Sequence, residues 1–401
     1  MIERITSHPR LGRWVSLGAV TSMALLSSGC GYLQTDDAPL NSLNPQGTQS
    51  QTIHDLVTPV FAVAGVVFVV VQALIVFMAF KFRRRKNDVD GIDEPTQTHG
   101  IPKLEWAWTI APAVLLAFLA VFNVQAIWEL EKRDDPNMIS VEVYGQQWWW
   151  EYRYDVDSDG EIDIITANQM VVPAGTLIDL DIRSNDVIHS FWIPTLNGKK
   201  DAVPGRTHHW TIQAHKPGLY EGTCTEFCGL SHAHMRMEVK AVTTAEYEQW
   251  VEEQTAPANI PEDPTPDDSS DDDLVLTGYK AFVASCATCH QLNGIDELGA
   301  ETDGTPNADY RGADHPLTSG NAPNLTHLMS RNRFAGNLFS LWELDEDGNY
   351  TDRVDESTLG NWLRNPENMK QMAAGENRGM PNLQLSQDQI DALVAFLATL
   401  K

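Results

Sequence analysis

Two long stretches without a charged residue constrain the fold of this chain more than any other feature. One lies between Asp55 and Lys81, and the other lies between Glu105 and Glu129. Each exceeds the roughly 20 apolar residues that a membrane-spanning helix requires. We therefore expect a transmembrane hairpin over residues 50–132. Two buried core helices are the alternative.

The charges and small residues around these stretches predict an orientation. A basic cluster at residues 83–86 follows the first stretch, and such clusters stay on the cytoplasmic side. Arginines, an apolar segment at 14–26 and small residues precede Cys30, which is typical of an export signal over residues 1–29. We expect lipidation of Cys30, with uncleaved or differently cleaved export as the alternative. Everything after Trp128 then faces the extracytoplasmic side of a bacterial inner membrane.

From about Met138 the sequence changes to an alternation of apolar and polar residues. Ile178, Leu180 and Ile182, for example, are separated by charged residues. This period of two predicts half-buried strands, and Gly-containing turn signals separate them at short intervals. We expect a small antiparallel β-barrel or sandwich over residues 138–245.

The last part of the chain divides into a linker and a second soluble domain. Residues 252–273 are rich in Pro, Ser, Asp and Glu and contain no Lys or Arg, which predicts an acidic, extended linker. A flexible coil of this length spans on the order of 25 Å, enough to let one domain move against another. In residues 274–401, Ser386 and Gln389 have capping-box spacing before an apolar helical pattern. These residues predict a small helical domain.

A loop before one alternating strand concentrates side chains that bind soft metals. Its candidate ligands are Cys224, Cys228, His232 and Met235. Sulfur with imidazole suits copper, and a mononuclear blue-copper site needs one Cys, so the second thiolate implies a pair of copper ions. His189, at the end of a predicted strand, is the best candidate for a second imidazole. The alternatives are a disulfide between the two cysteines, a zinc site, or simple burial.

A second motif, Cys286-Ala-Thr-Cys289-His290, is the attachment signal of a covalent c-type haem. The two thiols form thioethers with the haem, and the histidine reaches the iron. Met380, on a loop before the last predicted helix, is the candidate for the other axial ligand. Weaker candidates are Met329, Met369 and Met372. A redox-active dithiol is the alternative use of the two cysteines.

The copper loop resembles the binuclear copper loop of cytochrome c oxidase subunit II, over a match from about residue 50 to 245. The resemblance implies a cupredoxin-like barrel behind a two-helix hairpin, in a multidomain membrane protein. It also implies bridging Cys224 and Cys228, terminal His189 and His232, a weak Met235 ligand, and the Glu226 carbonyl as a further ligand.

Other roles are implied by the same resemblance. The Glu226 side chain is expected to bind magnesium shared with subunit I. Trp148, the first tryptophan of segment 145–150, is expected to lie near the surface above the copper and to accept the electron from the donor. Glu105 is expected at the entrance of a proton path into subunit I.

The C-terminal domain resembles the all-α cytochrome c domain fused to subunit II in caa-type oxidases. Segments 322–327 and 362–366 carry this resemblance, whereas the stretch 291–321 is longer and more acidic than the family pattern. The resemblance implies an electron-transfer subunit that passes electrons from a cytochrome c or another donor, through haem and copper, to subunit I. Coupled proton translocation and a subunit III partner are implied as well.

Three other functions are alternatives, and nucleic-acid binding is disfavoured. A quinol oxidase subunit II would lack the copper ligands, and a copper-delivery protein would need no covalent haem. An anchored carrier that serves another reductase differs only in its partner. The net charge of −27 argues against nucleic-acid binding, because a protein that grips phosphates presents a basic surface. It favours basic partners, and an acidic surface that serves only solubility is the alternative.

Overall fold

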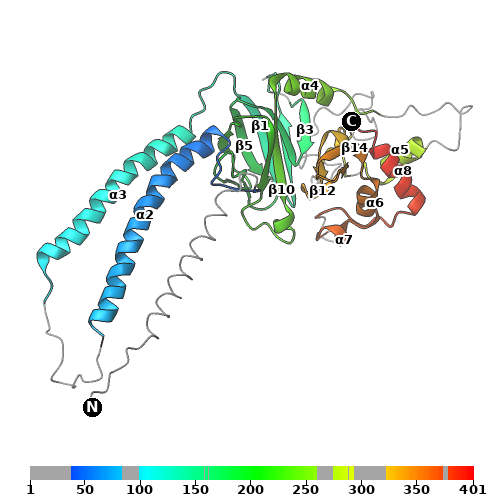
Figure 1. The fold of residues 1–401 in the computed structure, drawn as a ribbon. Coiled ribbons are helices and arrows are strands. Elements are labelled where there is room, and N and C mark those ends of the chain that lie inside the picture. The colour runs from blue at the N-terminus through cyan, green and yellow to red at the C-terminus, as the bar shows by residue number, and fades with distance from the viewer. Residues whose placement is uncertain are drawn as a thin grey trace, which may run out of the picture.

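The computed structural model describes residues 38–83, 99–157, 159–160, 162–259, 274–287, 289–292, 322–373 and 378–401. The predicted export signal with Cys30, most of the acidic linker and nearly all of segment 291–321 lie outside these residues. A helical hairpin, a β-sandwich and a mainly helical C-terminal domain follow one another along the chain (Figure 1).

The two uncharged stretches form the long helices α2 (Thr48–Lys81) and α3 (Pro102–Leu130). Both are long and apolar enough to cross a membrane, and nearly all of their large apolar side chains are exposed, so the chain is membrane-anchored. Figure 1 shows them leaving the sandwich side by side. The first turn of α2 is buried against the sandwich, where Ser50 Oγ donates to the Thr195 carbonyl at 2.6 Å. The hairpin is thus attached directly to the soluble domain.

The sandwich consists of a five-stranded sheet in the order β3-β2-β1-β5-β8 and a three-stranded sheet in the order β4-β10-β9. These strands are β1 (Ile139–Gln146), β2 (Trp149–Tyr154), β3 (Ile164–Ala167), β4 (Gln169–Pro173), β5 (Ile178–Ser184), β8 (His208–Ile212), β9 (Gly218–Thr223) and β10 (Arg236–Val242). A separate pair joins β6 (His189–Phe191) and β7 (Lys200–Ala202).

The alternation predicted for β5 is confirmed, because Ile178, Leu180 and Ile182 are completely buried in the core. The strand directions differ in part from the antiparallel expectation. Most pairs are antiparallel, but β1 pairs with β5, and β4 pairs with β10, in parallel. Alternation reports which face of a strand is buried and carries no information about the direction of its neighbour.

Helix α4 (Thr244–Thr255) closes one side of the sandwich and enters the region predicted as linker. Thr243 and Glu246 form a capping box at its start, and the Trp250 ring packs 5.2 Å from the Tyr154 ring. The helix ends only at Thr255, and Gln254 is buried, so residues 252–255 belong to the helix and not to an extended linker. Packing against the sandwich outweighs the acidic composition that predicted an extended chain here.

The C-terminal domain is built on helices α5 (Leu274–Ser285) and α8 (Gln387–Leu397), with α6 (Glu356–Arg364) and the short α7 (Pro366–Met369). A Cβ atom at Gly278 would lie 1.9 Å from the Ala392 carbonyl oxygen, so glycine permits the close approach of α5 and α8. The domain is helical as predicted, with two small hairpins that the sequence analysis did not anticipate. They are β11 (Arg333–Phe334) with β12 (Phe339–Ser340), and β13 (Trp342–Leu344) with β14 (Tyr350–Val354).

Candidate functional site

The loop after β9 and the start of β6 bring the predicted copper ligands into one cluster. Cys224 Sγ lies 3.8 Å from Cys228 Sγ and 3.9 Å from His189 Nδ1. The backbone carbonyl oxygen of Glu226 lies 3.3 Å from Cys224 Sγ. His189 is fully buried, and both thiols are free. The spacing of the two sulfur atoms is well beyond the roughly 2.05 Å of a disulfide bond.

His232 and Met235 complete the cluster from the opposite side of Cys228. The short helix η2 (His232–His234) places His232 Nδ1 3.5 Å from Cys228 Sγ. Met235 Sδ lies 3.8 Å from the same sulfur and is completely buried. Two thiols, two imidazoles and a thioether form a donor set that suits copper, whereas zinc sites use no thioether. The residues present therefore fit a copper centre.

Asp186 fixes the orientation of His189. Its carboxylate accepts a hydrogen bond from His189 Nε2 at 2.8 Å, so Nδ1 faces the sulfur atoms. Burial opposes the charged form of the imidazole, but Asp186 and then Cys224 raise the pKa of His189. Burial likewise opposes ionisation of Asp186, but hydrogen bonds from His189 and from backbone amides, including that of Gln147, lower the pKa of Asp186. Partners of this kind orient metal-binding imidazoles and tune their affinity.

The two thiols of the cluster affect each other's ionisation. The hydrogen bond between them lowers the pKa of Cys224 and raises the pKa of Cys228. Without a metal the raised pKa of Cys228 favours its protonated form. Metal binding replaces such protons, because thiolates are the ligands.

Trp148 lies directly against the copper loop. Its Nε1 donates to the Cys228 carbonyl at 3.0 Å, and the side-chain amide of Gln147 donates to the same oxygen at 2.6 Å. Trp148 was expected near the surface, but its exposed fraction is only 4 %. The C-terminal domain covers it, because Lys370 Nζ donates to the Trp148 carbonyl at 2.7 Å.

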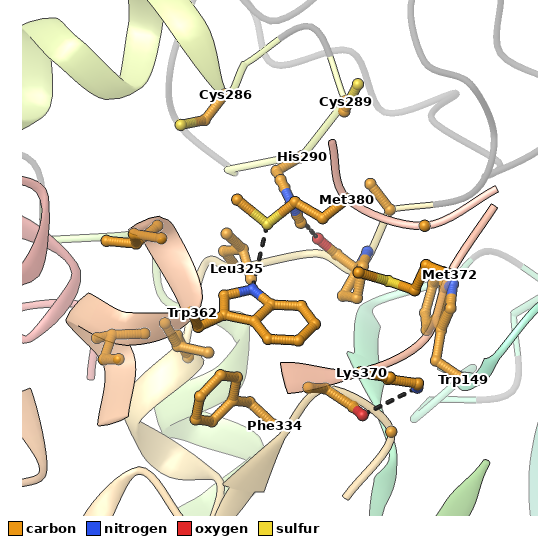
Figure 2. A pocket seen from close by; sticks show the side chains of 18 of the residues that line it. Trp149, Cys286, Cys289, His290, Leu325, Phe334, Trp362, Lys370, Met372 and Met380 are labelled. Atoms are coloured by element: carbon orange, nitrogen blue, oxygen red, sulfur yellow. Dashed lines mark hydrogen bonds between the residues drawn. The ribbon is translucent and has the colours of Figure 1, made fainter. Parts of the chain in front are cut away.

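The haem-attachment motif opens onto a large, mostly apolar cavity at the end of α5. Figure 2 shows Cys286, Cys289, His290 and Met380 among the side chains that line this cavity. His290 Nδ1 lies 2.8 Å from the Pro323 carbonyl, which leaves Nε2 free to bind a metal. Burial lowers the pKa of His290, so the imidazole is held in its neutral, ligating form.

Met380 is held by the indole of Trp362, whose Nε1 donates to Met380 Sδ at 3.1 Å. Met372 also lines the cavity, whereas Met329 and Met369 are not among its lining residues. Two cysteines, a neutral imidazole and a thioether around an apolar cavity fit a covalently held haem. Trp149 of the sandwich contributes to the same wall (Figure 2), so the cavity lies at the boundary between the two domains.

Two buried cations in the cavity wall were missed by the sequence analysis. Burial lowers the pKa of Arg331 to about 10 and the pKa of Lys370 to about 7. Arg331 Nε donates to Thr166 Oγ1 of the sandwich at 3.2 Å. No local pattern distinguishes a buried Lys or Arg from the exposed ones, because their burial depends on contact between distant segments. Glu105 lies elsewhere, exposed in the first turn of α3.

Comparisons with known families cover nearly the whole chain. Residues 41–126 match the transmembrane domain of cytochrome c oxidase subunit II, and residues 158–242 match its periplasmic domain. Residues 275–401 match cytochrome c. Cytochrome c oxidase subunit 2 of Alkalihalophilus pseudofirmus is 32 % identical over 388 residues, covering 94 % of this chain and 95 % of the relative. The chain belongs to the cytochrome c oxidase subunit II family.

Other members of the family differ in how much of the chain they match. Subunit 2 of Bacillus sp. strain PS3 is 30 % identical and covers 98 % of both chains, whereas quinol oxidase subunit 2 of Bacillus cereus is 31 % identical over only 59 % of this chain. The crystal structure of the periplasmic domain of subunit II from Bradyrhizobium japonicum has a TM-score of 0.28 and 30 % identity. It covers 31 % of this chain and 96 % of its own. Subunit II domains imply copper, and a cytochrome c domain implies haem.

The hydrogen bond between Asp186 and His189 yields a test of the copper site in this subunit II. Asp186→Asn removes the carboxylate charge but keeps the size of the side chain. We expect about 10- to 100-fold weaker copper binding, the usual cost of losing such a partner. Competition with a copper chelator measures the affinity. The exposed Asp352 provides the matched control, Asp352→Asn, which leaves the affinity unchanged; an unchanged affinity in Asp186→Asn would contradict the assignment.

Proposed function

We propose that this chain is the electron-accepting subunit of a proton-translocating terminal oxidase. It takes electrons from a cytochrome c or another external donor and delivers them to subunit I, where dioxygen is reduced. The observation that carries this proposal is the pair of donor sets in one membrane-anchored chain, with Trp148 between them. Both soluble domains lie on the extracytoplasmic side of a bacterial inner membrane, and subunits I and III are the partners.

We assign the following residues to each of the two centres. His189, Cys224, Cys228, His232, Met235 and the Glu226 carbonyl hold a pair of copper ions. Cys286 and Cys289 would hold the haem covalently, and His290 and Met380 would bind its iron. When bound, each centre accepts and releases single electrons without making or breaking bonds in the protein.

The protein keeps both donor sets in fixed positions. Asp186 holds the His189 ring, the Pro323 carbonyl holds His290, and the Trp362 indole holds Met380. Apolar walls limit the access of water to the haem cavity, and together with the thioether ligand they favour a high haem potential. Rigid ligands also need little rearrangement when the charge of a centre changes.

Trp148 lies between the two centres. Its indole contacts the copper loop through the Cys228 carbonyl, and Trp148 is also among the residues that line the haem cavity. We assign to Trp148 the transfer of the electron towards the copper ligands. A solely structural role would not require contact with both centres.

The composition of the centres is tested first. We expect about two copper ions and one covalent haem per chain, because two thiolates bridge two metals and both cysteines of the attachment motif react. Elemental analysis of the purified full chain, with haem staining after denaturing electrophoresis, measures both. One copper ion per chain, or a haem that separates from the protein, would overturn the proposal. Copurification with a haem-containing subunit that consumes oxygen distinguishes the oxidase from a carrier for another reductase.

The role of Trp148 is tested by Trp148→Phe, which keeps an aromatic ring but loses the hydrogen bond to the copper loop. We expect severalfold slower electron transfer into copper with unchanged copper content. Rapid-mixing spectroscopy of the holoprotein measures this rate. Trp210→Phe is the matched control, because its indole also donates to a carbonyl, that of Gly198 at 3.1 Å, and Trp210 is not among the residues that line the haem cavity. Equal rates in the two variants would remove Trp148 from the path.

Two acidic residues carry further assignments. Glu105 is assigned to the entrance of a proton path into subunit I, so Glu105→Gln is expected to slow oxygen uptake while leaving both centres intact. The Glu226 side chain is assigned to magnesium shared with subunit I, although in the isolated chain it lies 3.8 Å from Lys199 Nζ. Replacement of magnesium by manganese gives a spin-resonance signal that Glu226→Gln is expected to alter. Unchanged oxygen uptake or an unchanged signal rejects the corresponding assignment.

A further inference from the structure

The sandwich and the C-terminal domain share a polar interface beside both centres. Its backbone contact runs from the Arg236 amide to the Gly336 carbonyl oxygen at 3.0 Å. Asn337 Nδ2 donates to Glu238 Oε2 at 3.2 Å, so a side chain from the C-terminal domain also reaches strand β10. The C-terminal domain therefore rests on the sandwich through specific hydrogen bonds.

Lys370 lies at the centre of this interface. Only 4 % of its surface is exposed, and its ammonium donates to the carbonyls of Trp148 at 2.7 Å and Ala335 at 2.9 Å. One acceptor belongs to the sandwich and the other to the C-terminal domain. Among the described residues no carboxylate forms an ion pair with Lys370. Burial lowers the pKa of Lys370 to about 7, but the neutral amine also has enough hydrogens for both carbonyls.

Gly336 makes the approach of Lys370 to Trp148 sterically possible. Its φ of +78° lies in the region that favours glycine. A Cβ atom there would lie 2.6 Å from Lys370 Nζ, and 2.9 Å from both the Trp148 and His234 carbonyl oxygens. Any residue with a Cβ atom at position 336 would push the two domains apart at this point.

Burying a lysine without a carboxylate partner costs free energy, and its hydrogen bonds to one carbonyl of each domain offset that cost only while the domains are in contact. A domain that swings freely on its linker would leave this ammonium in water. We infer that Lys370 is a positioning residue that latches the C-terminal domain onto Trp148, so that electrons reach copper from a docked haem domain and not from a swinging one.

This inference rests on the proposed function and deepens it. One electron leaves the reduced haem, which is oxidised, and reduces the copper pair. No bond forms or breaks, and the external donor supplies the next electron. Because the docked domain covers Trp148, a soluble donor must deliver its electron to the haem domain.

Hydrogen exchange of the intact chain measures docking without any redox step. The Arg236 amide reports the interface, and the Ala174 amide, bonded to the Val242 carbonyl at 2.8 Å within the sandwich, is the internal reference. In Lys370→Met we expect about tenfold faster exchange at Arg236, since losing a hydrogen bond to a charged group lowers the docked population by that order. Exchange at Ala174 stays unchanged. Equal exchange at Arg236 in wild type and variant would overturn the latch.

Electron transfer tests the functional part of the inference. After rapid reduction of the haem, the rate of copper reduction in the wild-type holoprotein is expected to be independent of solvent viscosity. In Lys370→Met it is expected to be slower and to fall as viscosity rises, because the domains must first meet. A wild-type rate that falls in proportion to viscosity would overturn the inference without any variant.

Two further variants complete the design. Gly336→Ala, which acts on the same contact by crowding, is expected to reproduce both effects if Lys370→Met does not accumulate. Lys216→Met, at an exposed position, is the matched control and leaves both measurements unchanged. The copper and haem contents distinguish a failure of the proposed function from a failure of the latch alone. A chain without its metals contradicts the proposed function, whereas a loaded chain with unaltered exchange contradicts only the latch.

Discussion

Two thiols with sulfur atoms 3.8 Å apart in a protein interior cannot both ionise freely, because the two negative charges would repel each other in a medium of low dielectric constant. Hydrogen bonds to the cluster reduce this repulsion. Asp186 orients His189 on one sulfur atom, and η2 brings His232 to the other. Bound copper would compensate the remaining negative charge. The polar groups of the sandwich therefore compensate only part of the negative charge of the two ionised sulfur atoms.

The second domain depends on the same arrangement, because it is attached beside the copper loop. Trp148 contacts the loop through its indole and the C-terminal domain through its carbonyl. A single residue therefore connects the position of the copper ligands to the position of the haem cavity. In this chain the covalent link between the two domains keeps the local concentration of the docking partner high.

The sequence was sufficient to predict the hairpin, the half-buried strands and the residues that the fold gathers into the two donor clusters. These features are encoded locally, as the length of an uncharged stretch, an alternation of period two, or ligands within a dozen residues such as Cys224 to Met235. The parallel pairing of β1 with β5 and the two small hairpins of the C-terminal domain were not predictable in this way. They depend on which distant segments meet, and no short pattern records that choice.

By itself, the sequence determined the chemistry of this protein: two thiols with imidazoles and a thioether in one motif, and a haem-attachment signal in another. It could not determine how the two centres face each other. The tertiary structure decided that the surface expected to receive a donor is instead covered, with Lys370 buried between two carbonyls. The physical reason is that metal-ligand chemistry resides in short segments, whereas burial of a charge depends on the packing of whole domains.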